Sequence, residues 1–289
     1  MMTMTSMKMK YKKSKLGVPL YLFLFVLTYV ALLFMASPWL QPWIIMQNVE
    51  QFQLHQFSAE ELIQNRATVE PTYEDFYDIV EPDLRMVLSQ ITEVSSNDVI
   101  GGIVIPDVDI QLPILAGTTH YNLLVGATTI DHNITMGEGN FVLVGHNMSH
   151  GGILFSRLLD ISDDAHIHVT DGAYIHIYRV VETAVIHQNE ISVIEPTEEA
   201  MITLITCDQP TVWTQNRFMV RGELISTHDI NSDSLLVHPI QQAMNGSQAS
   251  FFQRNAFTLS LIGIGGCSGM IILGLIMISI RDRKKLERS

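Results

Sequence analysis

Two uninterrupted apolar stretches enclose a long central region in which hydrophobic and polar residues alternate over short runs. Residues 16–36 carry no charged side chain, and neither do residues 256–280. Both stretches reach the roughly 20 residues that a helix needs to cross a bilayer. Basic residues precede the first stretch and follow the second. The positive-inside rule therefore predicts two transmembrane helices, with both termini in the cytoplasm and the central region outside the cell.

A cleaved signal peptide is the alternative interpretation of the first stretch. Its apolar run is longer than the roughly 7–15 residues of a signal-peptide core. The residues that follow it, Ser37-Pro38-Trp39, are a poor match to a small-residue cleavage site. We therefore expect an uncleaved membrane anchor.

The central region begins with a helical pattern and then changes to short strands. Residues 39–68 have helical spacing, and a short helix is expected near 83–90. From residue 100 onward, apolar runs of strand length alternate with turn residues. Strand-like runs lie at 103–105, 110–114, 141–145, 166–169, 173–180, 181–187, 200–207 and 217–226, with a further apolar run at 123–126 and a short helix expected at 151–161. About eight short strands with few helices predict a mainly β fold, an eight-stranded closed or nearly closed β-barrel flanked by N- and C-terminal transmembrane helices.

This pattern divides the chain into seven parts. They are a cytoplasmic basic tail (1–15), a transmembrane helix (16–36), an extracellular stalk or N-terminal extension (37–98), a β-barrel (99–228), a linker (229–255), a second transmembrane helix (256–280) and a cytoplasmic basic tail (281–289).

The region between the two stretches is strongly acidic. Residues 37–255 contain seven basic residues, all arginine, against 28 acidic residues. Such a charge excess argues against nucleic acid or an anionic surface as a partner.

Three side chains of the central region suggest acyl-transfer chemistry. Cys207 ends the apolar run 200–207 and is the only cysteine outside the apolar stretches, so no internal disulfide is expected there. His146 follows the run 141–145, and Arg217 begins the last strand. A lone cysteine is often only a small buried hydrophobe. A thiol, an imidazole and a guanidinium at strand ends are, however, the groups that attack a carbonyl, shuttle protons and stabilise an oxyanion.

The sequence around these residues resembles the sortases, the Gram-positive transpeptidases that attach surface proteins to the cell wall. The matching pieces are Thr203–Cys207, Gly145-His146, and Arg217 with Val220–Leu224. With Ile105-Pro106 and Leu112–Ile114, the similarity covers about residues 72–228. The order and spacing of these pieces are specific, and the resemblance implies a sortase catalytic β-barrel over residues 99–228.

The resemblance also implies a role for each residue. Cys207 would attack the carbonyl after threonine in an LPXTG-like sorting signal, and His146 would protonate the departing glycine amine. Arg217 would stabilise the oxyanion. A cell-wall amine, lipid II-like, would then resolve the thioacyl intermediate. Thr206 is a candidate to hydrogen-bond the peptide, and Val144 either lines the groove for the signal's leucine or belongs to the barrel core.

Residues 126–129 and 136–140 are similar to the pattern of the housekeeping class A sortases. A C-terminal membrane span is nevertheless more common in class C, whose members polymerise pilins through a lysine nucleophile. Three alternatives stay open: a pilin-polymerising sortase, a hydrolytic cysteine peptidase and a non-catalytic membrane-tethered peptide-binding module.

Other histidines and acidic residues offer weaker site candidates. His120 is the second choice for the catalytic base. His166 and His168 share a strand face, but two ligands rarely make a metal site. Some class A sortases bind calcium, which needs six or more oxygen ligands. The acidic candidates are Glu138, Glu190, Glu195, Glu198 and Glu199. We assign no cofactor, and calcium stays unassigned.

Overall fold

The structure is a computed structural model that describes residues 17–74, 82–131, 135–149, 152–210 and 214–246. The chain divides into two units, Met1–Leu40 and Gln41–Ser289, and helix α1 (Gly17–Val49) runs through the boundary. Within the described residues, no helix combines the length and hydropathy that a membrane crossing requires. Residues 17–36 of the first predicted span belong to α1, whereas the predicted segments 1–15, 256–280 and 281–289 lie outside the described residues. Both flanking spans remain predictions.

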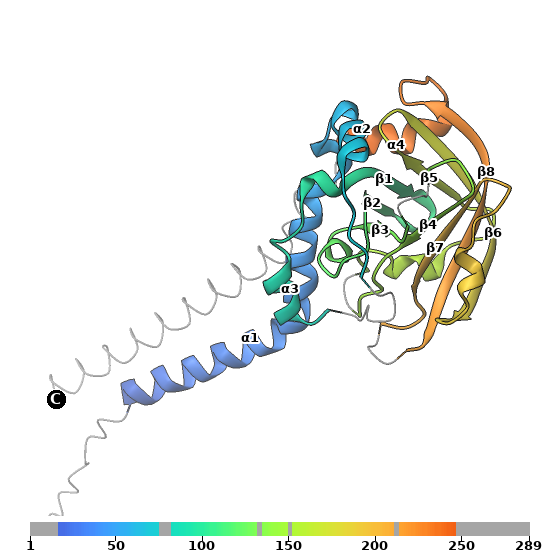
Figure 1. The fold of residues 1–289 in the computed structure, drawn as a ribbon. Coiled ribbons are helices and arrows are strands. Elements are labelled where there is room, and N and C mark those ends of the chain that lie inside the picture. The colour runs from blue at the N-terminus through green and yellow to red at the C-terminus, as the bar shows by residue number, and fades with distance from the viewer. Residues whose placement is uncertain (1–16, 75–81, 132–134, 150–151, 211–213, 247–289) are drawn as a thin grey trace, which may run out of the picture. The chain divides into compact units, whose positions relative to one another are not determined.

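The centre of the second unit is a closed eight-stranded barrel, which confirms the predicted fold (Figure 1). Its strands follow the order β1-β2-β3-β4-β7-β8-β6-β5 around the barrel. Their bounds are β1 Val99–Ile105, β2 Ile110–Leu115, β3 Ala127–Thr129, β4 Asn140–Val144, β5 His166–Thr170, β6 Tyr174–His187, β7 Met201–Cys207 and β8 Asn216–Asp229. Closure removes the exposed sheet edges that would otherwise pair with other chains.

The structure corrects the expected strands in two places. The apolar run 123–126 begins within a 3-10 turn, Asn122–Leu124, and the strand β3, which was not among the eight expected strands, follows at 127–129. The buried amide of Asn122 donates to the carbonyls of Ala116 and Gly117 and so stabilises the turn. The two strands expected at 173–180 and 181–187 form the single strand β6, which contains a bulge between Val180 and Glu182.

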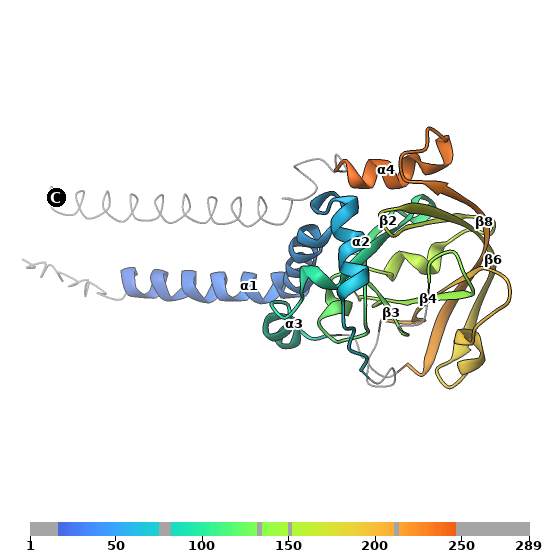
Figure 2. The same cartoon turned by 45° about the horizontal axis from the view of Figure 1, so that its top comes forward.

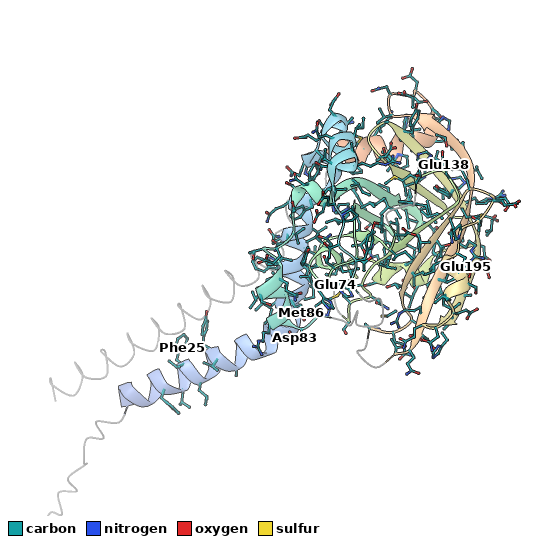
Figure 3. The ribbon with its side chains drawn as sticks, in the orientation of Figure 1. Phe25, Glu74, Asp83, Met86, Glu138 and Glu195 are labelled. Carbon is teal, nitrogen blue, oxygen red and sulfur yellow. The ribbon has the colours of Figure 1, made fainter. Side chains whose placement is uncertain are left out.

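The predicted helices are confirmed in part. Helix α3 (Leu84–Gln90) lies where the sequence predicts it, and the Asp83 carboxylate accepts a hydrogen bond from the Met86 amide as its N-cap (Figure 3). The prediction over 39–68 holds for the end of α1 and for α2 (Ala59–Thr68), with 3-10 turns at Glu50–Phe52 and Leu54–Gln56 between them. The helix expected at 151–161 is instead a 3-10 turn at Ser156–Asp160.

The predicted N-terminal extension packs on the barrel over much of its length. Ile45, Leu54, Leu62 and Val87 are completely buried and belong to the main hydrophobic core. A capping box joins Ser58 to Glu61 at the start of α2. Burying an aliphatic side chain contributes about 1.5–3 kcal/mol, so this segment stabilises the barrel.

The region predicted as a linker at 229–255 also packs on the barrel. It contains a 3-10 turn, Leu235–Val237, and helix α4 (His238–Met244). Val237 and Ile240 are buried in the main core. Helices α4 and α2 both contact β1 and lie at the same end of the barrel (Figure 2).

Candidate active site

The pairing of β4 with β7 places His146 beside Cys207. The two strands are parallel, and Val144 is paired with Ile205. The ladder continues past the end of β4, because the Gly145 amide donates to the Ile205 carbonyl over 3.1 Å. His146 lies two positions after Val144, and Cys207 lies two positions after Ile205. In a parallel pair this spacing puts them at the same level.

Two side-chain hydrogen bonds hold these strand ends together. The Thr206 hydroxyl donates to the Gly145 carbonyl over 2.8 Å, and the Asn147 amide nitrogen donates to the Cys207 carbonyl over 2.9 Å. Both side chains are buried. Thr206, the residue before Cys207, is thus hydrogen-bonded to Gly145, the residue before His146. The peptide-binding role suggested for Thr206 stays a prediction.

Sequence reasoning missed Asn147. Asn147 directly follows His146 in the sequence. Its side chain reaches the carbonyl of Cys207, sixty residues later in the chain, and only the pairing of β4 with β7 in the folded protein shows this contact. A buried amide that donates to a buried carbonyl contributes about 1 kcal/mol and fixes the geometry around it. Asn147 therefore joins the list of residues that shape the site.

Arg217 lies directly opposite Cys207 in the antiparallel pairing of β7 with β8. The residue is 6% exposed. One terminal nitrogen donates to the carbonyls of Thr214 and Asn216 over 3.2 and 2.9 Å, and the other donates to the Gln188 side-chain oxygen over 3.2 Å. These acceptors fix the orientation of a permanent positive charge beside the cysteine, where it favours a thiolate and a developing oxyanion.

The catalytic histidine candidate is deeply buried, whereas the cysteine remains partly exposed. His146 is 3% exposed. Its burial, together with the nearby charge of His120, lowers its pKa from 6.5 to about 4. Neutral imidazole is then the main form at pH 7. A thiolate and an imidazolium coexist only in a minority of molecules, as the resemblance to sortases implies for the reactive state.

An apolar cavity of about 200 Å³ adjoins these residues. It is lined by Ile130, Ile186, Gln188, Glu190, Ile191, Val193, Ile194, Ile205 and Arg217. Ile205 lies two residues before Cys207, and Arg217 lies opposite Cys207, so the cavity reaches the nucleophile's surroundings. A mainly aliphatic wall with one cation suits a peptide that carries an apolar side chain and a reactive carbonyl.

Val144 packs beneath this cavity. It is 3% exposed and forms a small apolar cluster with Leu123, Val142, Val193, Ile205 and Met219. It is not among the described residues that line the cavity. Its burial in this cluster is consistent with a core position, and the groove-lining role stays a prediction.

The histidines and glutamates that the sequence suggested as metal ligands do not gather into one group among the described residues. The His166 and His168 rings meet edge to face with centroids 6.2 Å apart. Among the calcium candidates, Glu190 lines the apolar cavity, while Glu138 and Glu195 occupy separate positions on the barrel (Figure 3). No group of three or more His, Cys, Asp or Glu side chains in the described ranges is arranged to hold a metal ion. Calcium therefore stays unassigned.

Comparison with known proteins gives consistent matches. A sortase domain family matches residues 103–225. The chain is 33% identical to sortase A of Listeria monocytogenes over 208 residues, which cover 72% of this chain and 92% of that protein. It is 35% identical to sortase A of Bacillus anthracis over 158 residues, which cover 55% of this chain and 74% of that protein. The solved structure of Listeria monocytogenes sortase A is 37% identical and aligns with a TM-score of 0.48, covering 52% of this chain and 99% of that chain.

Proposed function

This chain belongs to the sortase family of cysteine transpeptidases, and we propose that it is a class A-like member that cleaves an LPXTG-like sorting signal between threonine and glycine. The observation that carries the proposal is the meeting of three groups at one end of the barrel. Cys207 and Arg217 are paired across β7 and β8, and Val144 and Ile205, two residues before His146 and Cys207, are paired across β4 and β7. An apolar cavity opens next to them.

In the first half of the proposed reaction, the Cys207 thiolate attacks the carbonyl carbon of the signal's threonine. The guanidinium of Arg217 stabilises the negative charge that develops on the carbonyl oxygen. His146, as imidazolium, gives its proton to the amine of the glycine, and the threonine–glycine bond breaks. The products are a thioester on Cys207, a neutral His146 and a free glycine amine.

In the second half, an amine from a cell-wall precursor, lipid II-like, attacks the thioester carbon. Neutral His146 accepts the proton of that amine, and the carbon–sulfur bond breaks to release the thiolate. The enzyme returns to its starting state, and an amide bond joins the sorted protein to the precursor. No cofactor takes part in this sequence.

The cavity supplies an apolar site for the signal's leucine. Its wall is built from β6, β7 and the 3-10 turn Ile191–Ile194 between them. A fully buried leucine side chain contributes about 1.5–3 kcal/mol to binding. That energy would hold the signal while the threonine carbonyl lies against Cys207.

We also propose that the catalytic barrel lies outside the cell membrane, with both termini in the cytoplasm. The two uncharged stretches and their basic flanks support this arrangement. Labelling of single cysteines placed at Ser6 and at Ser234, in a C207A/C267A background in intact cells, tests it. We expect an impermeant reagent to label only the cysteine at position 234. Labelling at position 6 would contradict the topology.

The test of activity uses the full-length protein, because Ile45, Val49, Leu54 and Leu62 belong to the main core and a chain that starts later would lose them. The protein is incubated with a Leu-Pro-Glu-Thr-Gly peptide, with and without an amine, beside a C207A control. Mass spectrometry should show an adduct on Cys207 and an amine-joined product that are absent in C207A. A peptide released only by water would indicate a hydrolytic peptidase.

Two further reactions test which amine the enzyme prefers and whether its activity needs calcium. A lysine-bearing pilin-like peptide is offered in competition with a cell-wall amine. Preference for the lysine would favour the pilin-polymerising alternative over the class A-like role. Parallel reactions with a chelator and with added calcium measure whether activity needs the ion, and we expect the rates to be equal.

A further inference from the structure

The apolar cavity beside Cys207 has one acidic side chain in its wall. Among the described residues that line it, only Arg217 and Glu190 are charged, and all the others except Gln188 are aliphatic. A charged group loses hydration when an apolar peptide covers it, which costs free energy unless the peptide supplies an opposite charge. A carboxylate in this wall is therefore unfavourable for a purely apolar signal and favourable for one that brings a cation.

Glu190 stands at the end of the cavity that Arg217 occupies. Gln188 continues the pairing of β6 with β8 past Arg217, because its amide donates to the Gln215 carbonyl over 2.8 Å. The Gln188 side chain also accepts from the guanidinium over 3.2 Å. The chain then turns, and the Glu190 amide donates to the His187 carbonyl over 2.9 Å. Glu190 thus lies in a turn directly after the residue that binds Arg217.

The loop that carries Glu190 is anchored to the barrel. The side-chain amide of Asn140, at the start of β4, donates to the carbonyls of Val193 and Glu195 over 2.9 and 3.0 Å. Val193 is buried and packs in the small apolar cluster with Ile205. These contacts fix the loop as a wall of the cavity, so its side chains meet a bound peptide in a defined place.

The carboxylate of Glu190 has no structural role in this loop. Glu190 is the N-cap residue of the 3-10 turn Ile191–Ile194, but its side chain makes no capping hydrogen bond. Within the parts of the chain that the structure describes, it forms no ion pair either. The residue is exposed. Because a glutamate side chain is ionised at pH 7, it gives this end of the cavity a negative charge that a substrate can meet.

We propose that Glu190 is a specificity-determining residue, which favours sorting signals with a positively charged side chain at the variable position X and disfavours those with an acidic one. The inference rests on the proposed function, in which the signal's leucine enters the cavity and its threonine carbonyl lies against Cys207 and Arg217. Position X directly precedes that threonine, and each residue of an extended peptide advances only about 3.3–3.6 Å. X therefore lies at the Arg217 end of the cavity, where Glu190 stands.

The experiment compares three sorting peptides that differ only at X: Leu-Pro-Lys-Thr-Gly, Leu-Pro-Gln-Thr-Gly and Leu-Pro-Glu-Thr-Gly. Each is offered to the full-length protein at pH 7 and low salt with the same amine, and kcat/KM is measured from release of the glycine-bearing fragment. The lysine peptide should exceed the glutamate peptide by about 10-fold, with the glutamine peptide between them. In E190Q this ratio should fall by about 5- to 10-fold, as expected for one charge acting through largely aqueous surroundings.

The variant E195Q is the matched control. Glu195 is exposed on the same loop, and it is not among the described residues that line the cavity (Figure 3). E195Q removes the same charge and should keep the ratio of the wild type. An unchanged ratio in E190Q would overturn the inference, and so would an equal fall in E195Q, while cleavage of the glutamine peptide would still support the proposed function. No fragment from any of the three peptides would overturn the proposed function and this inference with it.

Discussion

Cys207 and Arg217 are directly paired across the antiparallel strands β7 and β8. Each side chain is therefore positioned by a ladder of backbone hydrogen bonds rather than by a loop. The carbonyls of Thr214 and Asn216 and the side chain of Gln188 then orient the guanidinium. A fixed cation needs little rearrangement when negative charge develops during the reaction, which is the condition for strong electrostatic stabilisation.

Replacing this arginine by lysine should lower kcat strongly. An ammonium cannot present the planar, forked set of donors that reaches three acceptors on different sides. We expect R217K to reduce kcat by about 10²–10³-fold, the usual loss when an oxyanion donor is removed. The control is R179K, which makes the same exchange at a surface arginine paired with Glu223. Steady-state rates close to those of the wild type in R217K would refute the role of Arg217.

The hydroxyl of Thr206 should matter more for catalysis than for stability. Thr206 and Thr203 are both buried on β7, and each donates one hydrogen bond, to the Gly145 carbonyl over 2.8 Å and to the Asn140 side chain over 2.6 Å. T206V and T203V should each lower the free energy of unfolding by about 1–3 kcal/mol. Only T206V should also reduce kcat, by about tenfold, because it loosens the strand that leads to His146.

Denaturant titration and steady-state kinetics of both variants provide the measurement. If T203V reduced kcat as much as T206V, the loss would reflect general destabilisation. The hydrogen bond between Thr206 and Gly145 would then have no catalytic effect beyond its contribution to stability.

Shortening an aliphatic side chain of the cavity should weaken substrate binding. Ile194 lines the cavity, so I194A should raise KM for the sorting peptide by about 5- to 50-fold with little change in kcat. The matched control is I225A on β8, since Ile225 is 42% exposed and is not among the cavity-lining residues. Equal values of KM for both variants would show that the signal's leucine binds elsewhere.

Buried histidines should make the folded protein sensitive to mild acid. Burial lowers the pKa of His168 from 6.5 to about 4, with a further contribution from His166. Between these two values the unfolded chain binds a proton that the folded protein excludes. The contribution of His168 to stability is therefore complete above pH 6.5 and is lost as the pH falls towards 4.

The variant H168Q removes this titration. The difference in unfolding free energy between pH 7 and pH 4.5 should shrink by about 1–3 kcal/mol relative to the wild type. H187Q, at an exposed position of β6, is the control and should leave the difference unchanged. Denaturant titrations at a series of pH values make the comparison. An unchanged acid sensitivity in H168Q would show that other groups control it.

Local patterns in the sequence were enough to predict the mainly β barrel and helix α3, and they singled out Cys207, His146 and Arg217 as candidates for the chemistry. Strand patterns and turn residues are local signals, and the thiol, imidazole and arginine stand at strand ends that a sequence motif can show. The apolar run 123–126 did not by itself reveal a turn, because apolar residues alone do not show that the side-chain amide of Asn122 stabilises one there.

The side chains that surround these candidates could be found only from the folded structure. Asn147 reaches the Cys207 carbonyl, and Glu74 reaches His120, across sixty and forty-six residues of chain. It also showed that Leu54 and Leu62 of the predicted stalk belong to the barrel core. Such contacts depend on strand register and chain crossing, which the closing of the barrel determines, and no local pattern in the sequence records them.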